Sequence, residues 1–232
     1  MRLRNLCCLN HPAVSLLFLL LFFSACRRNN PVDPAKIGHI HRVVVLGNSI
    51  VSSAPAPQLG WEYSWGMAAS ARDKDFVHLL MKDIHSRDTT VDIAWKNVAG
   101  FERRYRTYHF SELDSLKGAD LYIVKLAENV LDTATDFIPY YDSLLHYLDT
   151  RGAVKVIMDG FWKNPVNKKL DSYAGSHHLP FIYISDLSGD KSMEAGDHYK
   201  NYGVSVHPSD KGMQAIEKRI WDYVQVYFLP FH

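Results

Sequence analysis

A serine after an early apolar segment and a histidine near the C-terminus are the residues of this chain whose types could perform chemistry together. The apolar run Val43–Leu46 leads directly into Gly47-Asn48-Ser49, and His207 is followed by a proline about 25 residues before the end of the chain. A serine hydroxyl is a weak nucleophile at neutral pH until a neighbouring base takes its proton, and histidine is the usual base. The pair therefore indicates a serine nucleophile activated by histidine.

Five short apolar segments, separated by longer segments of helical periodicity, must position these two residues. This alternation is typical of βαβ units that form a parallel sheet covered by helices on both faces. We therefore expect an α/β protein, a three-layer α/β/α sandwich around a five-stranded parallel sheet. The strands are predicted at Arg42–Leu46, Val91–Trp95, Leu121–Leu126, Val154–Met158 and Phe181–Ile184.

Three longer segments carry apolar residues at helical spacing and are predicted to pack on this sheet. They are Lys74–Ser86, Phe137–Leu148 and a last helix from about Asp210 to Phe228, for which Ser209 or Asp210 would be the N-cap. The helices cover the faces of the sheet, so its edges and loops are left to bind ligands.

Four polar segments fall where the strands end, the edge at which open parallel sheets bind ligands. Ser49 follows the first predicted strand, and Gly100 comes shortly after the second. Asn129 follows the third strand, and His207 lies in the loop that enters the last helix. The four segments are therefore expected to meet at one site.

In these segments the chain resembles the SGNH (GDSL-like) hydrolases, a family of esterases and lipases with a flavodoxin-like fold. The likeness extends over about residues 43–227. The resemblance implies that Ser49 is the nucleophile, in a block that reads Gly-Asp-Ser in the family and has Asn48 in place of the aspartate here. It also implies that His207, in a His-Pro pair, is the base.

The resemblance further implies an oxyanion hole, a set of donors that hold the negative charge developing on the carbonyl oxygen. The donors would be the backbone N–H groups of Ser49 and Gly100 and the side-chain amide of Asn129. Only Asn129 in its block matches the family's Gly-x-Asn-Asp pattern. The implied reaction is acyl transfer through an acyl-enzyme that water hydrolyses, and it requires no metal and no cofactor.

The chain departs from the family at the third member of the catalytic triad. The family has an aspartate three residues before the histidine, where this chain has Val204. That aspartate normally fixes the tautomer of the histidine and stabilises the imidazolium. The sequence leaves several substitutes open: a backbone carbonyl, Ser205, or the carboxylate of Asp197 or Glu194.

Tryptophans in the loops at the same edge of the sheet are candidate substrate contacts. Trp61 and Trp65 lie in the long loop after the nucleophile, and Trp162 follows the fourth strand. Core packing is the commoner role of tryptophan, but flat aromatic faces at such an edge also suit sugar rings. The expected substrate is a small-molecule or glycan ester, with acetylated carbohydrates as the leading hypothesis.

The N-terminal segment is typical of a bacterial lipoprotein signal, with Arg2 and Arg4 before an apolar run that ends at Cys26. We expect a signal peptide over residues 1–25, lipidation of Cys26, a tether over residues 26–36 and one hydrolase domain over residues 37–232. The lipid would anchor the exported protein in the cell envelope, on the outer-membrane or periplasmic side. A transmembrane anchor and a plain secretory signal are the alternatives.

The charge of the chain argues against a nucleic-acid partner. The sequence has 26 basic and 25 acidic residues, a formal charge of +1, and no basic stripe. The leading hypothesis is an exported serine esterase whose rate falls on acidification as His207 becomes protonated. A lipase or lysophospholipase, and a glycan-binding lipoprotein with weak catalysis, are the alternatives that the sequence leaves open.

Overall fold

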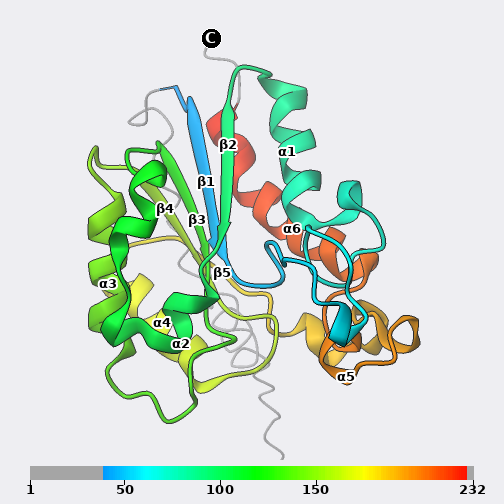
Figure 1. Cartoon of the computed structure of the whole chain (residues 1–232). Helices are drawn as coiled ribbons and strands as arrows, with labels where there is room; N and C mark the ends of the chain where they lie inside the picture. Colours follow the sequence, from blue (N-terminus) through cyan, green and yellow to red (C-terminus); the bar gives the residue numbers. More distant parts are fainter. Residues whose placement is uncertain (1–38, 229–232) are drawn as a thin grey trace, which may run out of the picture.

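The computed structural model describes residues 39–228, in which helices flank a parallel sheet on both sides (Figure 1). The strand order β2-β1-β3-β4-β5 is that of flavodoxin-like sheets. The fold class and all five predicted strands are confirmed, although β5 is two residues shorter than predicted. The strands are β1 (Arg42–Gly47), β2 (Asp92–Asn97), β3 (Leu121–Lys125), β4 (Val154–Met158) and β5 (Phe181–Ile182).

The predicted signal peptide, the lipidation site Cys26 and the tether lie outside the described residues. Within residues 39–228, no helix is both long and apolar enough to cross a membrane.

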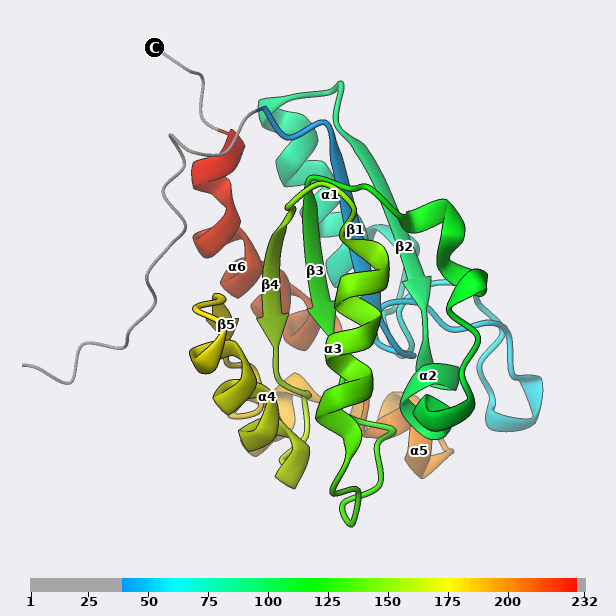
Figure 2. The same ribbon diagram turned by 90° about the vertical axis from the view of Figure 1, so that its left-hand side faces the viewer.

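Two layers of helices cover the sheet, as Figure 2 shows for the face that carries α3. The three predicted helices are present, and the last one ends earlier than predicted, at Val224, where a 3₁₀ turn replaces it. The helices α1 (Phe76–Arg87) and α6 (Asp210–Val224) pack on one face; α2 (Ala99–Arg104), α3 (Phe137–Leu148) and α4 (Pro165–Ser176) pack on the other. The short helix α5 (Tyr202–Ser205) lies in the segment before α6.

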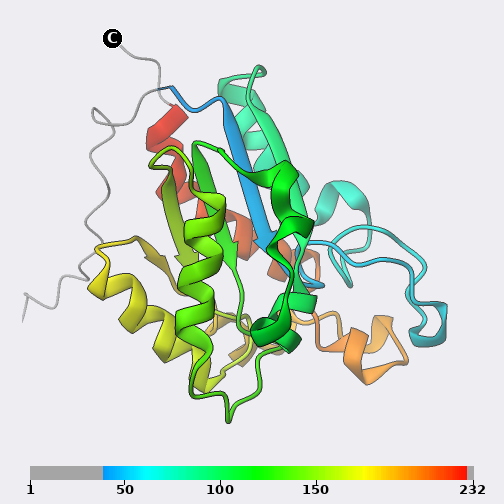
Figure 3. The same cartoon turned by 60° about the vertical axis from the view of Figure 1, so that its left-hand side comes forward.

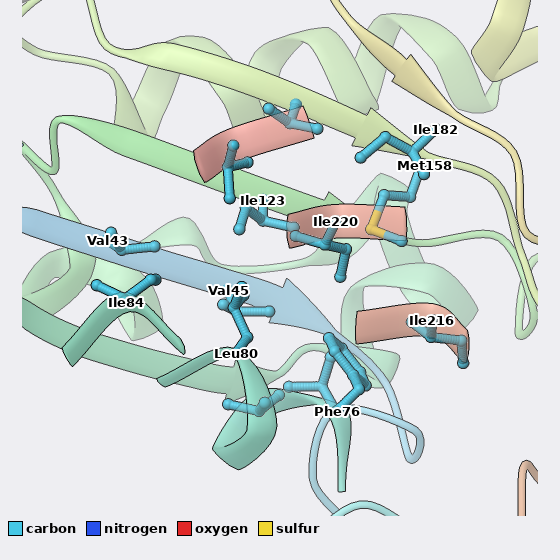
Figure 4. Close-up of a cluster of buried hydrophobic side chains, with 14 of the residues drawn as sticks. Val43, Val45, Phe76, Leu80, Ile84, Ile123, Met158, Ile182, Ile216 and Ile220 are labelled. Atoms are coloured by element: carbon cyan, nitrogen blue, oxygen red, sulfur yellow. The ribbon is translucent and has the colours of Figure 1, made fainter. Parts of the chain in front are cut away.

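Side chains of β1 enter two separate cores, which explains why this strand is apolar throughout. Val43 and Val45 belong to the cluster between the sheet and helices α1 and α6, shown in Figure 4. Val44 and Leu46 belong to the cluster on the opposite face. Successive side chains of a strand point to opposite faces, so a strand in the middle layer needs apolar residues at every position.

Two segments far apart in the sequence lie at the same end of the sheet. The loop after β1, drawn in blue to cyan, and the segment that carries α5, drawn in orange, are neighbours in Figures 1 and 3. The apolar cluster of Trp61, Met67, Ala68, Ala195 and Val204 joins the two segments. This end of the sheet therefore brings the first and the last candidate residues together.

Candidate active site

Ser49 and His207 are in contact at the carboxyl edge of the sheet. The Oγ atom of Ser49, two residues after β1, lies 2.8 Å from the Nε2 atom of His207. That distance is a hydrogen bond in which the hydroxyl donates and an unprotonated Nε2 accepts. The two residues lie 158 positions apart in the sequence, and the fold nevertheless pairs the predicted nucleophile with the predicted base.

The sharp turn that carries Ser49 depends on Gly47, the last residue of β1. A Cβ atom at this position would collide with the side chain of Val51 and would lie 2.9 Å from the carbonyl oxygen of Lys125. The carbonyl of Asn48 accepts the N–H of Val51 at 3.0 Å and closes the turn behind the serine. Glycine allows this close approach of two backbones, so it lets the chain leave the strand with Ser49 at the edge.

The second ring nitrogen of His207 is bound by a backbone carbonyl. Its Nδ1 lies 2.6 Å from the carbonyl oxygen of Gly203, within α5. An Nδ1 that faces an acceptor carries the proton, and Nε2 is then free to accept from Ser49. Asn201 fixes this short helix, since its side chain accepts the N–H of Val204 at 3.3 Å. The structure therefore fills the place of the missing aspartate with a peptide oxygen.

The side chains considered as a third member are engaged elsewhere. Glu194 forms an ion pair with a neighbouring lysine, and the Ser205 hydroxyl donates to a carbonyl of its own turn. Asp197 is an exposed residue of a separate 3₁₀ turn. Among the described residues, the hydrogen bond at Nδ1 goes to the main chain. The backbone carbonyl, one of the alternatives left open by the sequence, therefore takes the place of the third member, and the candidates Asp197 and Glu194 do not. The physical reason is local, because a helical turn brings the carbonyl four residues before His207 closer than either carboxylate.

Burial governs the protonation of His207, which is 9% exposed. The ring of Trp162 meets the imidazole edge to face, with the ring centroids 5.1 Å apart. Desolvation disfavours the imidazolium and lowers the pKa of His207 to about 4, although the hydrogen bond to Gly203 acts in the opposite direction. The imidazole is therefore neutral at neutral pH and able to accept the serine proton.

The three tryptophans predicted to contact substrate have different environments. Trp61 is fully buried in the apolar cluster that includes Val204, so the prediction was wrong for this residue, which serves as core. Trp65 is half-buried, and its indole N–H donates to a backbone carbonyl at 2.9 Å. Its ring stacks on the exposed Tyr63, with 4.3 Å between centroids. Trp162, of the three, lies against the candidate base.

The candidate oxyanion donors come from three separate segments. The backbone N–H groups of Ser49 and Gly100 have no hydrogen-bond acceptor within residues 39–228. Gly100 is the second residue of α2, and the first N–H groups of a helix have no partner inside it. The Nδ2 atom of Asn129 donates to Glu102 at 2.7 Å, and its Oδ1 accepts from Arg103 at 2.7 Å. One amide hydrogen of Asn129 therefore remains for a ligand.

A buried polar cluster, which the sequence did not predict, lies directly behind these donors. It consists of Asn48, Glu102, Lys125, Glu128 and Asn129, joined by hydrogen bonds and one ion pair. The side chains of Lys125 and Glu128 are 0% and 3% exposed, and Glu102 is equally buried. Two features of the sequence could have indicated this cluster. They are a lysine at the end of an apolar strand and a glutamate directly before Asn129.

The two carboxylates of this cluster differ in protonation. Burial raises the pKa of Glu102 to about 7, and the charge of Glu128 adds to the increase. Burial also acts to raise the pKa of Glu128, but the ammonium group of Lys125 outweighs it, so that pKa is lowered. Glu128 is therefore the ionised partner of Lys125 at neutral pH.

Comparison with known proteins bears on the fold. Neither a family model nor a curated protein matches this chain. A solved two-domain esterase (CEX) active on acetylated mannans, co-crystallised with mannopentaose, is similar with a TM-score of 0.53 and 15% identity, over 85% of this chain and 53% of that chain. The structure of TesA is similar with a TM-score of 0.51 and 15% identity, over 81% of this chain and 99% of that one.

The present chain spans about half the length of the two-domain esterase. At this level of identity the likeness establishes a shared fold, and it agrees with the α/β/α architecture that the alternation of apolar and helical segments predicted. The fold and the site together define an α/β sandwich with a serine and a histidine in contact at the carboxyl edge of its sheet.

Proposed function

We propose that this protein is an ester hydrolase of the SGNH type, with Ser49 as nucleophile and His207 as general base. The 2.8 Å contact between Oγ and Nε2 carries the proposal, since it is the hydrogen bond through which the proton would move. As Oγ attacks the ester carbonyl, Nε2 takes the hydroxyl proton and then gives it to the departing alkoxide. Water, deprotonated by the same nitrogen, hydrolyses the acyl-enzyme and restores Ser49.

The negative charge on the carbonyl oxygen would be held by the N–H groups of Ser49 and Gly100 and by the free amide hydrogen of Asn129. Removing one such donor typically lowers turnover about 100- to 1,000-fold. The Gly203 carbonyl keeps His207 in the tautomer that the reaction requires. Loss of the correct tautomer is a large part of the cost of removing a triad aspartate, so the peptide oxygen preserves the orientation without the charge.

We propose an acetylated carbohydrate as the substrate class. The fold that the chain shares with an esterase active on acetylated mannans supports this assignment, as does the half-buried Trp162 beside the base. An aromatic ring next to the base would stack on the sugar that carries the ester. The signal-like N-terminus supports export and lipidation at Cys26, which would place the enzyme in the cell envelope.

A glycan-binding protein with weak catalysis is the second candidate. The observation that favours it is the uncharged partner of His207, which gives the imidazolium less stabilisation than a carboxylate would. Such a protein would bind an acetylated oligosaccharide equally well with or without the Ser49 hydroxyl, and would release no acetate.

Release of acetate from an acetylated manno- or xylo-oligosaccharide, and hydrolysis of p-nitrophenyl esters of increasing chain length, test both candidates. For an esterase, turnover is highest with acetyl esters and Ser49→Ala lowers it at least about 1,000-fold. Preference for long acyl chains would instead indicate a lipase. Equal rates for Ser49→Ala and the unmodified protein would remove Ser49 from the mechanism, and glycan binding without any turnover would favour the second candidate.

A further inference from the structure

The buried polar cluster of Asn48, Glu102, Lys125, Glu128 and Asn129 is larger than the proposed reaction requires. We propose that it is the device that positions the oxyanion hole, and that residue 48 is an amide here because two carboxylates already face it. The inference rests on the proposed function and concerns the four members of the cluster to which that function gives no role. Asn48, Glu102, Lys125 and Glu128 act through the donors, one of which is Asn129, and are positioning residues.

Glu102 connects the three segments that carry the candidate oxyanion donors. It belongs to α2, two residues after Gly100. Its carboxylate accepts from the amide of Asn48 at 3.2 Å, beside Ser49, and from the amide of Asn129 at 2.7 Å. The carboxylate also accepts the N–H of Ala127, two residues before Asn129, at 2.7 Å. One buried side chain thus sets the spacing among the donors.

Glu128 connects the nucleophile turn with the segment that contacts the base. Its Oε2 accepts from the amide of Asn48 at 2.6 Å, and its Oε1 accepts the N–H of Phe161 at 2.8 Å. Phe161 precedes Trp162, whose ring packs against His207. The same Oε1 accepts from the ammonium group of Lys125. The ionised carboxylate therefore fixes both sides of the Ser49–His207 pair.

The charge balance of the cluster explains the residue at position 48. The amide of Asn48 donates to both Glu102 and Glu128. An aspartate would remove both donors and would bring a third carboxylate against two buried ones, with Lys125 as the cation inside the cluster. Like charges at this distance disfavour ionisation, and a buried carboxylate without a donor is costly. Asn48 is thus an adaptation to its two neighbours.

A reciprocal exchange of amide and carboxylate tests this inference. In Asn48→Asp the donors to both carboxylates are lost. In Glu128→Gln the new amide faces the Asn48 amide, and Lys125 loses its ionised partner. In the double variant, the Oε1 atom of the new glutamine would keep the contacts with Lys125 and Phe161. Its Nε2 would donate to the new aspartate at position 48. The hydrogen bond between positions 48 and 128 then runs in the opposite direction, and the cluster again holds two carboxylates and one ammonium group.

We expect each single variant to lower kcat for p-nitrophenyl acetate about 100-fold, the scale of one lost oxyanion donor, with KM changed less than about threefold. The double variant should recover kcat to within about tenfold of the unmodified protein, because it restores the hydrogen bond between positions 48 and 128, although not the donor from position 48 to Glu102. Gln214→Glu, the same change of amide to acid at an exposed site on α6, is the matched control and should leave kcat unchanged.

Thermal unfolding of each variant separates positioning from simple loss of fold. Wild-type kcat in Asn48→Asp, or a double variant no more active than the singles, would overturn the inference. So would recovery of the melting temperature in the double variant without recovery of kcat. If the unmodified protein hydrolyses no ester, the proposed function itself fails, which is a different result from an active enzyme that tolerates Asn48→Asp.

Discussion

The Nδ1 atom of His207 lies 2.6 Å from the carbonyl oxygen of Gly203, where a catalytic triad would hold a carboxylate. An aspartate performs two tasks there, since it orients the imidazole and stabilises its positive charge. The peptide oxygen orients the imidazole through its dipole. It carries no full negative charge, so it stabilises the imidazolium less than a carboxylate would. Because the acceptor lies in α5, only four residues before the donor, the orientation of the base is set within five consecutive residues.

An aspartate at position 204, where the SGNH hydrolases have one, should lower the stability of this protein. Val204 is fully buried against Trp61 and Met67, away from solvent. Val204→Asp would place a carboxyl group among apolar side chains without a hydrogen-bond partner, at a cost of roughly 2–5 kcal/mol in the free energy of unfolding. Urea denaturation measures that loss, and kcat should not rise.

Val204→Ala is the control, because it removes packing without adding a polar group and should cost less than the aspartate. An increase in kcat for Val204→Asp, with stability retained, would mean that a carboxylate can reach Nδ1 after all.

The rate should be independent of pH down to an unusually low value. Burial lowers the pKa of His207 from 6.5 to about 4, so the neutral base persists at pH 5. We expect kcat/KM to be flat between pH 5 and 8 and to fall below pH 5. The sequence predicts a fall on acidification, and the burial of His207 places that fall at a lower pH than an exposed histidine would give. A limb centred near pH 6.5 would contradict the burial seen here.

The same group makes stability depend on pH. The folded protein resists protonation of His207, whereas the unfolded chain binds that proton near pH 6.5. The contribution to stability is therefore complete above about pH 6.5 and declines as the pH falls towards about 4. Thermal melting of His207→Gln should lack this part of the pH dependence.

Removal of the ring of Trp162 should alter the base without touching the nucleophile. The indole covers the imidazole at a centroid distance of 5.1 Å. In Trp162→Ala water reaches His207, so desolvation is weaker, its pKa should rise, and the acid limb of kcat/KM should move with it. Trp162→Phe keeps an aromatic ring over the imidazole and should shift the limb less. Identical pH profiles for both variants and the unmodified protein would refute this role.

Gly47 should tolerate no side chain. In Gly47→Ala the new methyl group meets the side chain of Val51 and the Lys125 carbonyl, so the nucleophile turn must shift. We expect a loss of about 1–3 kcal/mol in stability together with a fall in kcat. Gly175→Ala, where a Cβ would meet no atom within 4 Å, is the comparison and should be neutral or stabilising. Equal behaviour of the two variants would argue against strain at the turn.

The strands and the Ser49–His207 pair could be predicted because their signals are local. Val43–Leu46 is apolar at every position and is followed by Gly47 and, two residues later, Ser49. The topology of a parallel sheet then brings the edge residues together. The Gly203 carbonyl could not be identified in the same way, since every residue has a carbonyl and only the backbone conformation selects one.

The buried polar cluster and Trp61 show a second limit of sequence reasoning. Lys125 ends an apolar strand, a position that normally faces solvent, and its burial becomes evident only when Glu128 is seen beside it. Trp61 lies in a loop, where an aromatic residue looks available for ligands, but α5 and the loop after β1 close over it. In both cases the deciding contact joins residues whose spatial relation depends on the complete fold.

The 158 positions between Ser49 and His207 also bear on how the protein becomes active. The segment with the nucleophile precedes α5 and the base in the chain, so the site can form only after the residues between them have been synthesised. Contacts of such long range form slowly, because the intervening chain must first be ordered. Hydrolytic activity should therefore appear as a late event of refolding, after the recovery of helical circular dichroism, and its half-time would report completion of the native topology.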